Sequence, residues 1–81
     1  MTCRDEVLES ARELARLSVS GEFTLAELLH HMIQKGTKYT DSTIRTHVTS
    51  RMCANAPDHH AVTYRDLKRT GYGTYRLVPK I

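Results

Sequence analysis

Apolar residues in the first part of the chain recur at spacings of three and four, which is the pattern of an amphipathic helix. This pattern predicts a first helix from Arg4 to Ser18. The apolar face of the helix is expected to carry Val7, Leu8, Ala11, Leu14, Ala15 and Leu17. Gly21 can take the left-handed backbone turn that ends the segment.

A second helix has a specific start signal in the sequence. Thr24 is followed three residues later by Glu27, the spacing of a capping box in which each side chain binds the other residue's backbone N–H. Phe23 and Leu28 stand at the positions of a hydrophobic staple around this box, and Gly36 ends the helix. The buried stripe is predicted to comprise Leu25, Leu28, Leu29, Met32 and Ile33.

A third helix follows after one short turn and begins at Thr40, which can cap it. The capping box is incomplete, because Thr43 stands where Glu would be. The helix is expected to run to about Ala54, before a segment, 55–58, that contains a proline. Its inner face is predicted to comprise Ile44, Val48 and Met52. Its outer face is predicted to comprise Ser42, Thr43, Arg45, Thr46, Thr49, Ser50 and Cys53.

The last third of the chain has the composition of short strands. Two glycines enclose Tyr72 between two such segments, and this arrangement predicts a β-hairpin over about 68–78. Tyr75 and Leu77 alternate with more polar neighbours, as they would in a half-buried edge strand. Three helices followed by a hairpin predict one α+β domain over residues 1–81, which leaves open that the chain is a module of a larger protein.

Charge is divided unevenly along the chain. Residues 1–34 contain three basic and six acidic residues, a net charge of −3, whereas residues 35–81 contain nine basic and three acidic residues, a net charge of +6. One side of the domain is therefore suited to a polyanion, of which nucleic acid is the commonest. A solvated basic surface has the same composition, so charge alone does not decide between the two.

The second and third helices, joined by the turn 35–40, predict a helix-turn-helix, in which the second member enters the major groove of DNA. The stretch 42–54 contains no Glu or Lys, and its short hydroxylated side chains let a helix approach base edges closely. Arg45 can reach guanine O6 and N7 or a phosphate. Arg51 lies nearer the flank, where the DNA backbone or a neighbouring acid is its expected partner.

Residues 24–54 followed by the hairpin 68–78 resemble the winged-helix family of DNA-binding domains. The resemblance rests on the order of the elements and on the composition of the hairpin, which would be the wing. It implies a three-helix core with a helix-turn-helix and a C-terminal β-hairpin wing. It also implies a first strand, for which only the short stretch 22–24 is available, so a third strand in the sheet is left open.

The resemblance further implies sequence-selective binding of double-stranded DNA, through a recognition helix at about 41–54 and a basic wing at about 67–78. The helix residues expected to contact bases or phosphates are Ser42, Thr43, Arg45, Thr46, Thr49, Ser50 and, at the flank, Arg51. The wing residues expected to hold the DNA backbone or minor groove are Lys68, Arg69, Tyr72 and Arg76. His59 and His60 are expected in the loop between, where imidazoles can donate to phosphate or face solvent.

Three threonines on the predicted recognition helix raise the question of methylated DNA. Threonine methyl groups pack on the C5-methyl group of thymine, and 5-methylcytosine carries the same group at the same place. Thr43, Thr46 and Thr49 can therefore serve either base. The segment 42–77 also resembles winged-helix modules of modification-dependent restriction endonucleases, which implies methylated DNA as a partner and a fused or associated nuclease domain. Transcription regulation is the other role left open.

Winged helices also act as protein–protein interaction modules without direct DNA contact, and this is the alternative function. An acidic face on the first helix could dock a partner domain or a second copy of the chain, which leaves a homodimer open. That face is formed by Asp5, Glu6, Glu9 and Glu13. The basic second half of the chain favours DNA as the partner.

Other kinds of chemistry have little support in the sequence. Cys3 and Cys53 form no CxxC pair and are expected to be reduced thiols in a cytoplasmic protein. Cys53 with His59 and His60 matches no common zinc spacing, and neither a metal nor a cofactor is expected. Cys53 near the histidines is the only candidate nucleophile beside a base, and a domain of this size offers no evident oxyanion site, which predicts that the protein is not an enzyme. No apolar run suggests a signal peptide or a membrane span.

Overall fold

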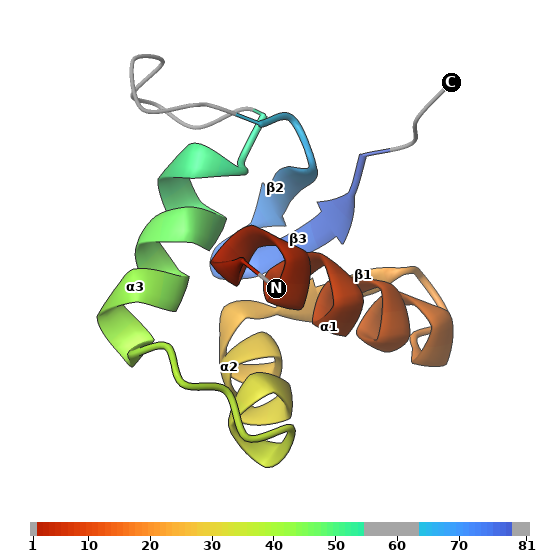
Figure 1. The fold of residues 1–81 in the computed structure, drawn as a ribbon. Helices are drawn as coiled ribbons and strands as arrows, with labels where there is room; N and C mark the ends of the chain where they lie inside the picture. Colours follow the sequence, from red (N-terminus) through yellow and green to blue (C-terminus); the bar gives the residue numbers. More distant parts are fainter. Residues whose placement is uncertain (1, 55–63, 79–81) are drawn as a thin grey trace.

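The computed structural model describes residues 2–54 and 64–78, and these residues form an α+β fold (Figure 1). The helices are α1 (Cys3–Leu17), α2 (Leu25–Gln34) and α3 (Asp41–Thr46), which continues into a π-helical turn, η1 (His47–Arg51). The strands are β1 (Glu22–Thr24), β2 (Leu67–Gly71) and β3 (Thr74–Leu77). None of these helices has the length and apolar character that a membrane crossing requires.

Polar side chains determine where the helices begin. Thr24 Oγ1 accepts the backbone N–H of Glu27 at 3.0 Å, and Glu27 Oε1 accepts that of Thr24 at 2.8 Å, so the predicted capping box is confirmed. Thr40 caps α3 as predicted, by accepting the N–H of Thr43 at 3.3 Å. α1 begins with another capping box, which was not predicted because Asp rather than Glu closes it.

The strands form one antiparallel sheet in the order β1-β3-β2, so β3 is its central strand. The predicted hairpin is confirmed, but the prediction of an edge strand for β3 is wrong. β1 pairs along the second edge of β3, with Phe23 opposite Tyr75. A backbone hydrogen bond of 2.9 Å from Leu25 N to Gly73 O continues this contact into the start of α2. The third strand therefore ties the hairpin to the helices.

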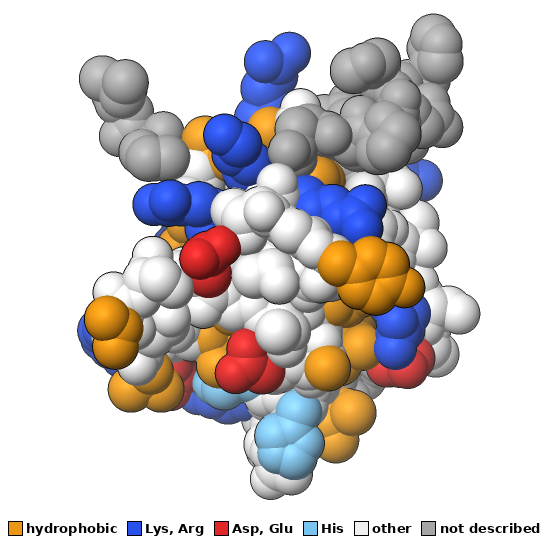
Figure 2. Space-filling model, turned by 180° about the vertical axis from the view of Figure 1, so that it is seen from behind, with side chains coloured by type: hydrophobic (Ala, Val, Ile, Leu, Met, Phe, Trp, Pro, Cys, Tyr) orange, Lys and Arg blue, Asp and Glu red, His pale blue; other side chains and the backbone are white. Residues whose placement is uncertain are grey.

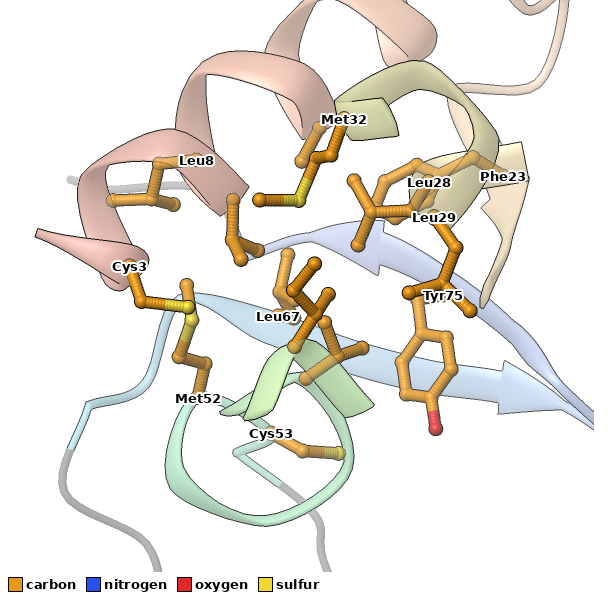
Figure 3. Packing of buried hydrophobic residues seen from close by; sticks show 14 residues of the cluster. Cys3, Leu8, Phe23, Leu28, Leu29, Met32, Met52, Cys53, Leu67 and Tyr75 are labelled. Carbon is orange, nitrogen blue, oxygen red and sulfur yellow. The ribbon is translucent and has the colours of Figure 1, made fainter. Parts of the chain in front are cut away.

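The hydrophobic core lies between the helices and one face of the sheet (Figure 3). The inner face predicted for the third helix is confirmed, since Ile44, Val48 and Met52 are buried. Ile33 of α2 is 60 % exposed, contrary to the prediction that it belongs to the buried stripe. α2 crosses α1 rather than running alongside it (Figure 1), and the C-terminal end of α2 contacts α1 through His31 and Lys35, both of which lie close to Glu13.

Two sets of polar contacts hold distant parts of the chain together. Arg4 Nε and Nη2 donate to the two carboxylate oxygens of Asp66 at 2.8 and 3.0 Å, which ties α1 to the segment before β2. Asp66 is buried, and its carboxylate raises the pKa of the Arg4 guanidinium. Between α1 and α2, His31 Nδ1 lies 2.9 Å from Ser10 Oγ. These contacts hold α1 against α2 and against the segment before β2.

Candidate nucleic-acid interface

α3 and η1 form one helical segment with a buried side and an exposed side. A backbone hydrogen bond of 2.8 Å from Met52 N to His47 O spans five residues and closes the π-helical turn. The segment ends at Arg51, about three residues before the predicted end. Of the predicted outer-face residues, Ser42, Arg45, Thr46 and Thr49 are exposed and Thr43 and Ser50 are half-buried; Arg51, which was predicted at the flank, is exposed.

Cys53 does not belong to the outer face, contrary to the prediction. It is 1 % exposed and is part of the hydrophobic core (Figure 3). The helix has already ended at this position, and the backbone of Cys53 forms an isolated bridge with Leu67. Its side chain therefore follows the direction set by this bridge, and helical periodicity no longer applies to it.

Two threonines on the exposed side have their hydroxyl groups turned back to the helix. Thr46 Oγ1 donates to Ser42 O at 2.9 Å, and Thr49 Oγ1 donates to Arg45 O at 2.7 Å. In a threonine side chain the methyl group occupies the other branch at Cβ, so a hydroxyl turned to the backbone leaves the methyl to face a ligand. The exposed side of this helix thus presents two methyl groups about one turn apart.

A groove of about 590 Å³ separates the exposed side of the helix from the hairpin. Arg45, Thr49 and Cys53 line it from the helix; Arg69, Tyr72, Gly73 and Tyr75 line it from the hairpin; and Thr24, Leu25 and Ala26 line it from the start of α2. The groove brings Arg45 and Arg69, which are 24 residues apart in the sequence, to facing walls of one depression. Residues of both predicted DNA-binding elements therefore share this surface.

The side chains of the four predicted wing residues do not all lie on the same face of the sheet. Arg69 and Tyr75 are register partners whose side chains point to the same face, and both line the groove. Lys68 and Arg76 are also register partners, but strand alternation directs their side chains to the opposite face. There they line a separate hollow of about 400 Å³. Only Arg69 and Tyr72 thus stand beside the predicted recognition helix.

The two wing residues at the groove are close to one another. Arg69 Nε donates to Gly71 O at 3.1 Å, and its guanidinium carbon lies 5.9 Å from the centroid of the Tyr72 ring. Tyr72 is 98 % exposed at the tip of the hairpin. On the facing wall, Arg45 Nε lies 3.5 Å from Asp41 Oδ2, an exposed ion pair of the kind that contributes little to stability. Arg45 can therefore exchange this partner for a ligand at little cost.

His47 is a residue of this surface that was not predicted. It lines a second, shallower hollow of about 260 Å³ on the exposed side of the helix, together with Ser42, Thr43, Thr46 and Arg51. His47 Nδ1 lies 2.9 Å from Thr43 O, and because a carbonyl oxygen only accepts, Nδ1 carries the proton. The position of His47 next to Val48, between the inner and outer faces, was the signal available in the sequence.

Basic side chains are unevenly distributed over the surface (Figure 2). Seen from behind the view of Figure 1, Lys and Arg side chains collect over the upper part of the surface, where acidic side chains are fewer (Figure 2). His59 and His60, which were predicted to reach the DNA backbone, lie outside the described residues. Within residues 2–54 and 64–78, no three His, Cys, Asp or Glu side chains are grouped as metal ligands would be.

Comparison with known protein families identifies the family of this chain. A family model described as a domain of unknown function, DUF7669, matches residues 2–77, a range that includes α1 through β3. No curated protein and no solved structure matches the chain.

Proposed function

We propose a DNA-binding function for this chain, which belongs to the DUF7669 family of domains of unknown function. In this proposal the chain is a winged helix that places the exposed side of α3 and η1 in the major groove of double-stranded DNA. The observation that carries it is the shared groove, in which Arg45 and Thr49 of the helix face Arg69 and Tyr72 of the hairpin. The element order α1-β1-α2-α3-β2-β3 supports the winged-helix assignment.

The proposed contacts divide into base reading and backbone holding. Arg45 on the helix carries a guanidinium that matches guanine O6 and N7, and it stands beside the two outward methyl groups of Thr46 and Thr49. Arg69 and Tyr72 stand across the groove from the helix, and in this proposal they hold the backbone of one strand of the duplex. α1 carries four of the nine acidic residues of the chain, and none of its residues lines the groove.

Binding measured against salt concentration tests this proposal. The full chain is titrated into a fluorescent duplex of random sequence at several ionic strengths, and we expect the logarithm of affinity to fall linearly with that of salt concentration. Selection from random duplexes, prepared unmodified, cytosine-methylated or adenine-methylated, then identifies the preferred site. A methylated site would favour a role beside a nuclease domain, and an unmodified site a role in transcription regulation. No binding to any duplex at low ionic strength would overturn the proposal.

Arg69→Ala and Lys68→Ala distinguish the two faces of the sheet. Arg69→Ala is expected to weaken binding to all duplexes alike and to reduce the salt slope by about 1, because it removes one phosphate contact. Lys68→Ala removes the same charge from the opposite face of the sheet and is expected to have a smaller effect on both quantities. A larger effect of Lys68→Ala on the salt slope would show that the DNA lies on the other side of the hairpin.

Replacing thymine with uracil in the selected duplex tests the threonine methyl groups. The exchange removes only the C5-methyl group, and we expect affinity to fall about three- to fivefold for each thymine that a threonine contacts. Thr49→Ser keeps the hydroxyl that donates to Arg45 O and removes the protein methyl. This variant should lose affinity on the thymine duplex and lose none on the uracil duplex. Equal losses on both duplexes would exclude a methyl–methyl contact.

A further inference from the structure

The hydroxyl group of Tyr75 is a polar group on an otherwise buried side chain. Tyr75 lies on the central strand β3 and is 3 % exposed, yet it lines the groove between helix and hairpin. In Figure 3 its oxygen lies at the edge of the hydrophobic cluster and is directed away from Leu28 and Leu29. Within the described residues no hydrogen bond reaches this oxygen, and it is not among the fully enclosed polar atoms. The ring is thus part of the core, while the hydroxyl opens to the groove.

The protonation state of Tyr75 defines the kind of ligand it suits. Burial raises the pKa of the phenol, and neighbouring Cys53 raises it further, while Arg69 acts in the opposite direction. The hydroxyl is therefore protonated throughout the physiological pH range and can donate a hydrogen bond. A donor that opens to a groove and has no acceptor among the described residues is available to an acceptor that a ligand supplies.

The surroundings of this hydroxyl favour an anionic acceptor. Arg45 and Arg69 line the same groove, and none of its lining residues within the described chain is Asp or Glu. The start of α2 also forms part of the wall. The capping box and the bond from Leu25 N to Gly73 O involve three of the first four N–H groups of α2, and the fourth belongs to Ala26, which lines the groove. The N-terminus of a helix adds positive potential at this point.

We propose that the groove holds one backbone phosphate of bound DNA, with the Tyr75 hydroxyl donating to a non-bridging phosphate oxygen. Arg69 supplies the neighbouring positive charge from the hairpin, and the start of α2 closes the third side. This inference rests on the proposed DNA-binding function and deepens it, because it identifies where one strand crosses the protein. It also adds a residue of the central strand β3 to the DNA contacts, whereas the sequence had predicted contacts from the hairpin only for its exposed residues.

Tyr75→Phe tests the inference, because it removes the hydroxyl and keeps the ring that packs in the core. On the selected duplex we expect affinity to fall about five- to tenfold, and by a similar factor on other duplexes, because a phosphate contact carries no sequence information. Tyr64→Phe is the matched control. It removes a hydroxyl from a ring that packs on Arg4, outside the groove, and should leave affinity unchanged.

Duplexes with a single neutral methylphosphonate, moved along each strand in turn, locate the phosphate. At one position wild-type protein should lose about tenfold in affinity, while Tyr75→Phe should lose much less at that position and the same as wild type at all others. If Tyr75→Phe binds every duplex with the affinity of wild-type protein, the proposed phosphate contact is excluded, whereas the proposed DNA-binding function is retained. If wild-type protein binds no duplex, the proposed function fails and the phosphate site fails with it.

Discussion

Arg45→Ala is expected to weaken binding to the preferred duplex by about 1–3 kcal/mol and to relax the base preference at one position of the site. Arg45 stands on the exposed side of α3, and its contact with Asp41 is an exposed ion pair of 3.5 Å. Arg45 therefore loses little interaction energy when it leaves Asp41, and in the complex it gains two hydrogen bonds to guanine O6 and N7. Competition binding with all four base pairs at each position measures both quantities.

Arg16→Ala is the matched control for this prediction. Arg16 is exposed in the last turn of α1, so this variant loses the same charge at a place remote from the groove. It should bind the preferred duplex nearly as tightly as wild-type protein does and keep the same base preference. If Arg16→Ala and Arg45→Ala weaken binding equally, or if Arg45→Ala keeps the full base preference, Arg45 does not read a base.

Leu28→Ala is expected to lower the free energy of unfolding by about 3 kcal/mol. Leu28 is fully buried in the cluster between α1, α2 and the sheet (Figure 3), and its truncation leaves a cavity in that cluster. A chain of this length has a total stability of about 4–12 kcal/mol, so the variant loses a large part of it. Urea unfolding followed by circular dichroism, with wild-type and variant slopes compared, measures the difference.

Ile33→Ala provides the control within the same helix. Ile33 is as large as Leu28 but 60 % exposed, so its truncation should change the free energy of unfolding by no more than about 0.5 kcal/mol. The two variants also distinguish the structure, in which only Leu28 is buried, from the sequence pattern, which predicted that both residues are buried. Comparable losses from the two variants would show that the end of α2 is packed in a way that differs from this structure.

Local signals in the sequence predicted the elements well, because the physics that sets them is local. Thr24 with Glu27 determines where α2 begins through two hydrogen bonds within one turn. The spacing of Ile44, Val48 and Met52 indicated the buried side of the third helix for the same reason. Gly73, one of the two glycines that predicted the hairpin, has a positive φ at the turn.

Features that depend on how elements meet could not be read from local patterns. β3 became the central strand because the short β1 pairs with its second edge, and no periodicity within β3 reveals that partner. Cys53 turned into the core because the helix ends before it and the chain bridges to Leu67. The separation of Lys68 from Arg69 follows from strand alternation, once the register of the hairpin is known.

The groove of the candidate site could not be predicted from the sequence. Arg45, Tyr72 and Tyr75 belong to segments that only the tertiary fold brings together. The sequence pattern predicted Arg45 and Tyr72 as exposed binding residues, and it predicted Tyr75 on the buried side of a strand. That assignment was correct for the ring, which is buried, but it could not show that the hydroxyl opens to a groove.

Mapping the backbone amide signals of the protein by NMR, during titration with the selected duplex, tests the central claim most directly. The account predicts that the largest shifts fall on α3, η1 and the hairpin residues around Arg69 and Tyr72, with small shifts along α1. Shifts concentrated on the acidic face of α1, or spread evenly over the chain without a preferred surface, would contradict it.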